Sequence, residues 1–434
     1  MKLSINSIVL SIFLASFATA GPVSRGQPIA NGSSKQMAPA RGQTAGAAYF
    51  ITNEPSGNFL ITAEIGTNGQ LTLRRAIDAG GIGAHGIVSP VGPDPLFSQG
   101  SVKASAAGNI VATVNSGSNT LAVFSIDPND STSVSMIGKP VGSGGQFPMS
   151  LAINKAGDSV CALNGGEVNG VSCFKVDKQS GLVPISNTVR SLGLNQTTPA
   201  TGPAGSASHI IFSEDNTQLI ASVKGVPPQP GFLAVWDIAS DGSLSADFQS
   251  IAPQKGGLLP FSMTVIAGKN AILATDAGLG FDIFDFNANR NGNASTNTNN
   301  TSSSGDRSSA NAIAGQSATC WSSFSPKTGN FFLTDVGTAT ITEVNVDNNL
   351  KGTIVKQYPQ ANGSATIDND IATVAGKDFL YVLAPGATSI DVLSLDGPGK
   401  ARNIQKVDIA GPAKSVGLTI NANNLQGMTT FVKN

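Results

Sequence analysis

Three observations predict an all-β fold, a seven-bladed β-propeller. First, three apolar runs separated by Gly/Asn-rich turns recur about every 50 residues, as in IVATVNSGSNTLAVFSID (110–127), VCALNGGEVNGVSCFKVD (160–177) and FFLTDVGTATITEVNVD (331–347). Second, 50 of the 434 residues are glycine and only 12% are charged, a composition that suits short strands and tight turns. Third, the hairpins number seven, which sets the blade count.

The second strand of each unit begins near Tyr49, Ile110, Val160, Leu219, Ala271, Phe331 and Leu380. Six of these strands follow a segment that reads as an inner strand, at 97–105, 147–154, 206–213, 259–266, 318–325 and 363–375. The first hairpin has no such segment upstream. We therefore expect the C-terminal segment AKSVGLTIN (413–421) to complete the first blade and close the ring by pairing with the N-terminal strand, whereas 425–433 has no assigned place.

The N-terminus has the features of a signal peptide, which predicts a secreted, extracellular or cell-wall protein. Lys2 precedes the apolar run 5–17, and Ala18-Thr19-Ala20 is a small-x-small cleavage site. The alternative, a membrane anchor, is disfavoured because the run is shorter than the roughly 20 residues that span a bilayer. We expect a signal peptide at 1–20, a disordered leader at 21–45, and one propeller domain at 46–434 with a low-complexity insertion at 287–315.

Seven N-x-S/T triplets lie in predicted loops, and export would expose them to glycosylation. Their asparagines are Asn31, Asn129, Asn195, Asn293, Asn299, Asn300 and Asn362. The formal net charge of -1 gives no electrostatic reason to expect nucleic acid or an anionic membrane as a partner. We expect a monomer.

The three cysteines have different predicted roles. Cys161 and Cys173 face each other across one hairpin if Leu163 faces Val171, which brings them close to disulfide reach in an oxidising compartment. The alternative is that both pack as small buried hydrophobes. Cys320 is left over and is expected to be buried on an inner strand.

The repeat phrases and the block GGIGAHGIVSPVGPDPLFSQGSVKAS (80–105) resemble the fungal secreted 3-carboxymuconate cyclase-like glycoproteins, a group within the lactonase superfamily that includes the 6-phosphogluconolactonases. The resemblance spans residues 46–434. It implies a seven-bladed propeller and, for enzymatic members, the making or opening of a lactone ring without metal or cofactor.

A ligand funnel is predicted where the inner strands and their preceding loops open. The candidate acid/base residues are His85 and His209, which are the only two histidines of the sequence, together with Glu214. A structural, hydrogen-bonded His209 is the alternative. The ligand-binding candidates are Gln99, Lys103, Gln146 and Trp321. We expect no metal site, because the inner strands offer only Asp368 and Asp370 as a pair of acids.

Two function classes remain open at this point. One is a secreted or cell-surface glycoprotein that binds a small organic acid, a lactone or an extracellular or cell-wall partner at the funnel without catalysis. The other is a metal-independent lactonizing cycloisomerase or lactone hydrolase acting on a muconate-like acid. The first is favoured because no arginine falls on a predicted inner strand, and arginine is the side chain that best binds polycarboxylates.

Overall fold

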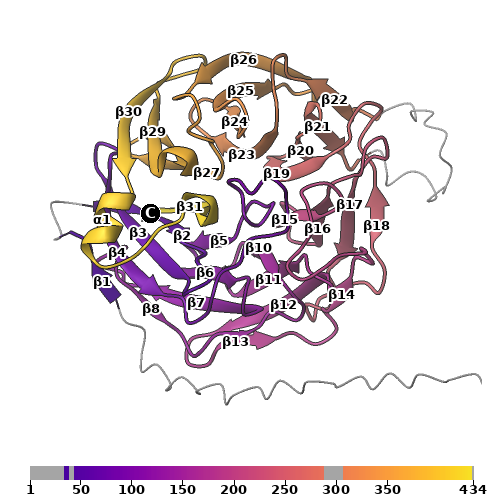
Figure 1. Cartoon of the computed structure of the whole chain (residues 1–434). Coiled ribbons are helices and arrows are strands. Elements are labelled where there is room, and N and C mark those ends of the chain that lie inside the picture. Colours follow the sequence, from indigo (N-terminus) through magenta and orange to yellow (C-terminus); the bar gives the residue numbers. More distant parts are fainter. Residues whose placement is uncertain (1–33, 39–43, 288–305, 433–434) are drawn as a thin grey trace, which may run out of the picture. The chain divides into compact units, whose positions relative to one another are not determined.

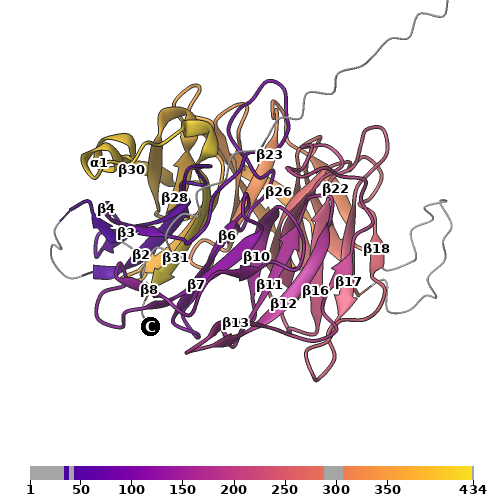
Figure 2. The same ribbon diagram turned by 60° about the horizontal axis from the view of Figure 1, so that its bottom comes forward.

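The structure, a computed structural model, describes residues 34–38, 44–287 and 306–432, and these residues form a closed ring of seven antiparallel sheets around a central axis (Figure 1). The inner strands of neighbouring blades contact one another in the cyclic order β5, β10, β15, β19, β23, β27, β31 and back to β5. Within a blade the chain runs from the inner strand outward, so consecutive strands alternate in direction between two faces (Figure 2). The fold class predicted from the sequence is confirmed.

Blades 1 to 4 contain the N-terminal half of the ring and the closing strand. Blade 1 comprises β31 (Gln426–Val432), β2 (Thr44–Ile51), β3 (Phe59–Gly66), β4 (Leu71–Asp78) and β1 (Ser34–Gln36). Blade 2 comprises β5 (Val102–Ser105), β6 (Ile110–Asn115), β7 (Thr120–Ile126), β8 (Val134–Met136) and β9 (Val141–Gly142). Blade 3 comprises β10 (Pro148–Ile153), β11 (Ser159–Asn164), β12 (Gly170–Asp177), β13 (Gly181–Pro184) and β14 (Arg190–Ser191). Blade 4 comprises β15 (Ala207–Phe212), β16 (Gln218–Val223), β17 (Phe232–Asp237) and β18 (Gln249–Ile251).

Blades 5 to 7 have four strands each. Blade 5 comprises β19 (Pro260–Ile266), β20 (Ala271–Asp276), β21 (Gly280–Asp285) and β22 (Ser309–Ala312). Blade 6 comprises β23 (Thr319–Ser325), β24 (Asn330–Asp335), β25 (Thr340–Val346) and β26 (Gly352–Pro359). Blade 7 comprises β27 (Asn369–Val374), β28 (Lys377–Ala384), β29 (Ser389–Leu395) and β30 (Ala401–Asp408). The described helical turns are η2 (Pro385–Ala387), α1 (Ala410–Ser415) and η3 (Ala422–Asn424).

We call the end of the ring where the inner strands begin the upper face, and the end where they finish the lower face. The upper face carries the loops between blades and between the second and third strands. The lower face carries the two remaining turns of each blade. This division follows from the antiparallel pairing of the strands and decides which loops can share a site.

The core lies between the blades, where apolar side chains on facing sheets interdigitate. The largest side chains without solvent exposure include Trp236, Trp321, Tyr49 and Tyr381. The two tyrosines also link blades, because Tyr49 donates to Ser131 O at 2.6 Å and Tyr381 to Gly69 O at 2.9 Å. A large buried aromatic or aliphatic side chain contributes about 1.5 to 3 kcal/mol by leaving water, so stability is spread over many such contacts between blades.

Serines on the recurring inner-strand phrase join adjacent blades near the axis. Ser98 donates from Oγ to Met149 O of blade 3, and Ser150 donates back to Gln99 O. Ser208 of blade 4 donates to Pro260 O of blade 5 in the same way, whereas Ser262 of blade 5 bonds to the hydroxyl of Ser322 in blade 6. The repeated serine therefore has a structural role. It satisfies main-chain carbonyls that the inner strands leave unpaired at the axis.

The ring closes through the C-terminus, but not through the expected segment. Strand β31 pairs antiparallel with β2, with Ala48 opposite Thr430, so the yellow and purple ends of the chain share blade 1 (Figure 1). The prediction that 413–421 would be the closing strand is wrong. Residues 410–415 form the helix α1, in which Pro412 lies in the first turn, where a helix tolerates proline. The segment 425–433, which had no assigned place, supplies β31 instead.

Two other boundaries differ from expectation. Ser34–Gln36, inside the expected disordered leader, forms β1 on the outer edge of blade 1, and β2 begins at Thr44. Ser309–Ala312, inside the expected insertion, forms the outer strand β22. Both segments are polar edge strands that need only main-chain partners, so hydrophobic periodicity does not reveal them. The expected signal peptide and the rest of the leader and insertion lie mainly outside the described residues.

Cys161 and Cys173 are directly opposed in the β11–β12 register and form a disulfide, while Cys320 is a buried free thiol. The two cysteines are separated by 12 residues, and closing such a loop stabilises a fold by about 3 kcal/mol at most. No helix of the described chain is long and apolar enough to cross a bilayer.

Deleting residues 426–434 should abolish cooperative folding of the ring. The deletion removes the inner strand of blade 1, so β2, β5 and β27 each lose their contacts with β31. Circular dichroism melting curves test this. Removal of residues 433–434 alone is the matched control and should leave the melting temperature unchanged. A truncation at 426 that melts like the full chain would contradict closure by β31.

Candidate functional site

A plug formed by residues 94–101 fills the upper half of the central channel. This segment precedes β5, and its purple trace crosses the middle of the ring (Figure 1). The main-chain N–H of Gln99 donates to Ser208 O of blade 4, and Leu151 of blade 3 donates to Gly100 O. Every residue of the plug is buried. The funnel that the sequence predicted on the upper face is therefore occupied by the chain itself.

Two of the predicted ligand-binding residues hold this plug in place. Gln99 donates from Nε2 to Ser322 O at 3.0 Å and accepts from Ser322 N at 3.1 Å. Trp321 donates from Nε1 to Ser98 O at 3.0 Å and packs edge-on against Phe261. Both side chains are already satisfied by the protein, so the structure gives them a positioning role rather than a free ligand contact.

A buried lysine fastens the plug to blade 4. Lys224 is 2% exposed and donates from Nζ to Phe97 O at 2.8 Å and to Ala207 O at 2.9 Å. Its ammonium lies 4.6 Å from the centre of the Phe261 ring. Burial lowers the pKa of Lys224, and the nearby Asp94 opposes that shift. Burial likewise raises the pKa of Asp94, and Asp368 raises it further.

Gln426, the first residue of β31, connects ring closure to the plug. Its Nε2 donates to Ser98 O at 2.9 Å and to Asp368 Oδ2 at 2.6 Å. Its Oε1 accepts from Leu96 N at 3.4 Å. The closing strand, the plug and blade 7 therefore meet at one buried amide.

Inner-strand residues in the lower half of the channel are more exposed to solvent than those in the upper half. The first residues of the inner strands are buried, while positions farther along several of these strands are half-buried. Examples are Lys103 on β5, Phe212 on β15, Thr264 on β19 and Asp370 on β27. These positions of the inner strands therefore keep partial contact with solvent.

His209 lies at the boundary between these halves and is a hydrogen-bond donor. It is 1% exposed and follows an irregularity in the β15–β16 register. The main-chain N–H of Met263 donates to His209 Nδ1 at 2.9 Å, so that nitrogen must carry the lone pair. Burial, followed by the charge of Lys103, lowers the pKa of His209 well below its usual range. The ring is therefore neutral, with its proton on Nε2, and Nε2 has no partner among the described residues.

Lys103, Asp368 and His209 gather around Gly100. A Cβ placed on Gly100 would lie 3.1 Å from Lys103 Cε and 3.2 Å from His209 Cδ2, the ring carbon bonded to Nε2. Gly100 has a φ of +89°, and its main chain lies near Asp368 and lowers the pKa of that carboxyl. Lys103 Nζ makes no hydrogen bond to any residue of the described ranges. A side chain at position 100 would fill the space bordered by Lys103, His209 and Ser150.

The two acids of blade 7 complete the cluster. Asp368 accepts from Gln426 Nε2 and from Gly427 N, and burial raises its pKa to about 7. Its Oδ1 has no partner within the part of the chain that the structure describes. Asp370 accepts from Thr430 N at 2.7 Å and from Thr430 Oγ1 at 3.0 Å, and burial raises its pKa while Lys103 lowers it.

His85 and Gln146 lie elsewhere, in loops of the upper face. Both ring nitrogens of His85 face main-chain carbonyls, at 2.7 Å from Gly86 O and 2.8 Å from Gly92 O. Gln146 accepts from Thr198 Oγ1 at 2.7 Å. No contact joins His85 to His209 among the described residues, so the structure does not bring the two histidines to one shared funnel.

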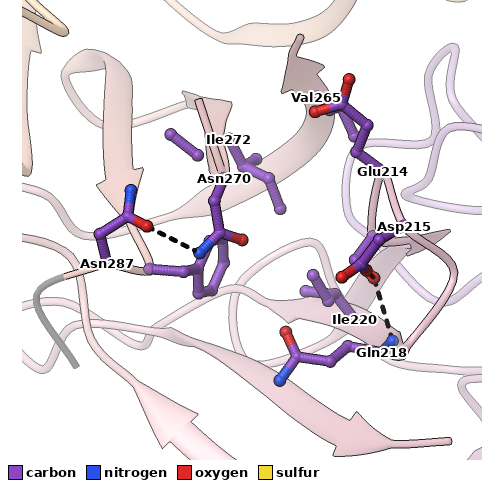
Figure 3. A pocket seen from close by; sticks show the side chains of 11 residues that line it. Glu214, Asp215, Gln218, Ile220, Val265, Asn270, Ile272 and Asn287 are labelled. Carbon is purple, nitrogen blue, oxygen red and sulfur yellow. Dashed lines mark hydrogen bonds between the residues drawn. The ribbon is translucent and has the colours of Figure 1, made fainter. Parts of the chain in front are cut away.

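Glu214 belongs to a separate pocket between blades 4 and 5 on the lower face. The pocket has a volume of about 350 Å³, with Glu214 and Asp215 on one side and Asn270 and Asn287 on the other (Figure 3). Glu214 accepts from Gly268 N at 2.8 Å, and hydrogen bonds from Ser213 and Thr217 lower the pKa of Asp215. The described residues that line this pocket include no lysine, arginine or histidine, so the pocket is rich in hydrogen-bond acceptors and distinct from the channel.

Three of the seven predicted glycosylation sites lie in the described chain, and all three asparagines are exposed: Asn129, Asn195 and Asn362. Asn31, Asn293, Asn299 and Asn300 lie outside the described residues. Within the described ranges no group of three His, Cys, Asp or Glu side chains is arranged to hold a metal ion.

Comparison with known proteins places this geometry in a family context. Residues 43–198 match the family model described as Lactonase, 7-bladed beta-propeller. This part of the chain is lactonase-like. The match covers blades 1 to 3 except for β31 and β1, and it includes the plug and the loop that carries His85.

Solved structures agree on the fold. A Bacteroides fragilis protein provisionally assigned as a 6-phosphogluconolactonase superposes with a TM-score of 0.58 at 14% identity, covering 91% of this chain and 100% of its own. The periplasmic gluconolactonase of Pseudomonas aeruginosa gives 0.58 at 15% identity, covering 83% of this chain and 96% of its own. A protein of unknown function from Desulfotomaculum acetoxidans gives 0.55 at 13% identity, covering 90% and 100%. No curated protein sequence matches.

Three buried residues around the plug were missed by the sequence analysis: Lys224, Asp94 and Gln426. Lys224 and Asp94 follow no repeat, and Gln426 lies in a strand whose place was unassigned. A usable signal was the apolar context of Lys224 in LIASVKGVPP, where a lone charge in an apolar stretch predicts burial with specific partners.

Replacing Asp368 by Asn should remove a pH-dependent component of stability. The folded chain binds the Asp368 proton more tightly than the unfolded chain, so this carboxyl makes the wild type less stable as pH rises from about 4, the ordinary aspartate value, to about 7. The melting temperature of D368N minus that of wild type should therefore increase across this interval and then level off. Asp215→Asn is the control, because its lowered pKa confines its effect to lower pH. Parallel curves for D368N and wild type would contradict the assignment.

Proposed function

We propose that this chain is a secreted, lactonase-like propeller that binds a small uncharged lactone bearing hydroxyl groups, in the channel below the plug, without catalysing its hydrolysis. The observation that carries this proposal is the pair of unmatched donors, Lys103 Nζ and His209 Nε2–H, on either side of Gly100. Lys103 Cε and His209 Cδ2 both lie within 3.2 Å of the position that a Cβ on Gly100 would take, so the two donors border the same space, and donors of this kind suit a carbonyl oxygen.

The charges around this point favour a neutral ligand over a polyanion. Lys103 is the one cation within electrostatic reach of His209, and it is faced by the carboxyls of Asp368 and Asp370. The arginines of the described chain lie on or beside outer strands: Arg74, Arg75, Arg190, Arg307 and Arg402. A tricarboxylate would meet too few cations here, whereas the hydroxyls of a neutral lactone can donate to the aspartates.

The state of His209 argues against histidine catalysis. A general base must offer a lone pair to the proton that it removes, and the lone pair of His209 already accepts from Met263 N. A neutral ring with its proton on Nε2 can donate a hydrogen bond to a bound ligand but cannot activate water. His209 is therefore a binding residue in this proposal.

One observation favours the second candidate function, lactone hydrolysis. Asp370 is half-buried beside Lys103 and has a raised pKa, which are properties of a carboxylate general base. In that case Asp370 would take a proton from water while Lys103 and His209 stabilise the oxygen that becomes negative. Its two hydrogen bonds from Thr430 weaken this role, because they stabilise the carboxylate that would have to accept the proton.

Export supports an extracellular site for either function. The N-terminal 20 residues have the pattern of a signal peptide, and the Cys161–Cys173 disulfide is of a kind that persists in oxidising compartments. The surrounding solvent would then be extracellular or in the cell wall.

Isothermal titration with ribono-1,4-lactone and with 3-carboxymuconate tests the proposal. We expect saturable binding of the lactone, weaker binding of the tricarboxylate, and a loss of about 10-fold or more in lactone affinity for Lys103→Met, since a charged hydrogen bond contributes about 1.5 to 3 kcal/mol. Glu214→Gln, in the separate pocket, is the control and should bind like wild type. Tighter binding of 3-carboxymuconate than of the lactone would overturn the proposal.

The same samples separate binding from hydrolysis. With the protein present, the rate of lactone ring opening measured by pH-stat should equal the rate in buffer alone. Turnover that is lost in Asp370→Asn and lowered in His209→Phe, but unchanged in Glu214→Gln, would replace the binding proposal with the hydrolase.

A further inference from the structure

Three loops of the upper face carry no acidic or basic side chain other than one histidine. Residues 81–93, 196–205 and 225–230 contain no Lys, Arg, Asp or Glu, and His85 is their one ionisable side chain. They do expose large apolar side chains: Ile87 is 52% exposed, Val91 62% and Val226 60%. We call Ile87, Val91 and Val226 the apolar patch. The loop carrying Ile87 and Val91 projects beyond the strands (Figure 2).

The loop 196–205 lies between the members of this patch. Ile87 forms a bridge with Thr201, and its N–H donates to Ala200 O at 2.7 Å. At the other end of the loop, a Cβ on Gly205 would lie 3.0 Å from a methyl carbon of Val226. Ile87 and Val226 therefore flank the same loop, and Val91 follows four residues after Ile87 in the neighbouring loop.

The side chain of Gln196 holds the start of this loop to two of the loop's own residues. Its Nε2 donates to Thr201 O at 3.0 Å and to Gly205 O at 3.1 Å, and its Oε1 accepts from Thr201 N. Leu194, the residue before Asn195, is held by two hydrogen bonds with Asn169. Asn195 thus stands between two anchored residues, next to the apolar patch.

Asn195 is exposed, and its side chain makes no hydrogen bond within the described residues. It begins the triplet Asn195-Gln196-Thr197, and Thr197 is exposed as well. In the triplet of Asn362 the corresponding Ser364 is 1% exposed. Asn195 therefore has the geometry of an acceptor whose carbohydrate can remain on the folded surface.

We propose that an N-linked glycan on Asn195 covers the apolar patch and keeps the plugged upper face from self-association. The inference rests on the export that the proposed function includes, because the modification takes place in the secretory pathway. Contiguous apolar surface on a soluble chain is otherwise an aggregation liability, and a glycan is bulky and strongly hydrated. The glycan lies on the face opposite to the opening of the channel, so it leaves the ligand route free.

Asn195→Gln and Asn129→Gln, produced in a host that glycosylates, test this proposal. Asn129 is the matched control because it is an exposed triplet asparagine in a turn between β7 and β8, on the lower face. Glycopeptide mass mapping should show Asn195 occupied. Loss of its glycan should lengthen retention on a hydrophobic-interaction column and raise the aggregated fraction in light scattering at least twofold, whereas loss at Asn129 should change neither.

A rescue variant separates shielding from folding. Adding Ile87→Ser and Val226→Ser to N195Q should restore wild-type retention and solubility, and enzymatic deglycosylation of the folded wild type should reproduce the N195Q behaviour. An unoccupied Asn195, or an N195Q protein that behaves like wild type, would overturn the proposal. Lactone titration of N195Q should match wild type, so failure of the shielding proposal would be distinguishable from failure of the proposed function.

Discussion

The structure depends on the hydrogen bonds that hold the plug, residues 94–101, inside the ring. A seven-bladed ring leaves an axial channel lined by the edges of seven inner strands, and the main-chain groups at those edges need partners. The plug supplies them for blades 3, 4 and 6 through Met149, Ser208 and Ser322, and the side chain of Gln426 in blade 1 bonds to the main chain of the plug. Because Gln426 belongs to the closing strand, the plug and ring closure stabilise each other.

Filling the upper half of the channel also determines the chemistry that remains available. Partners inside the protein already occupy Gln99, Trp321 and both nitrogens of His85. Two of the buried groups left unmatched lie at the lower margin of the plug, where His209 presents a donor and Asp368 an acceptor near Lys103. A lactonase-like fold is thus combined with a small, nearly neutral cluster reached from the lower face.

Much of the fold could be predicted because each blade repeats one pattern of apolar runs and turns. The closing strand could not, since 413–421 and 425–433 both alternate in a way that suits a strand. The choice between them depends on tertiary pairing with β2 and on Gln426 reaching Asp368, neither of which periodicity records. For the site, the sequence placed His209 and Lys103 on inner strands, but the local irregularity that turns Nδ1 of His209 toward Met263 N is invisible before the backbone is known.

Hydrogen exchange of the plug amides is the most direct test of this account. The N–H groups of Ser98 and Gln99 donate to Asp94 Oδ1 and Ser208 O inside the ring. If the plug is an integral part of the closed ring, these amides should exchange as slowly as those of the inner strands β10 and β15, through global unfolding alone. Exchange of the plug amides orders of magnitude faster, with the inner strands still protected, would show that the plug opens independently and would contradict the account.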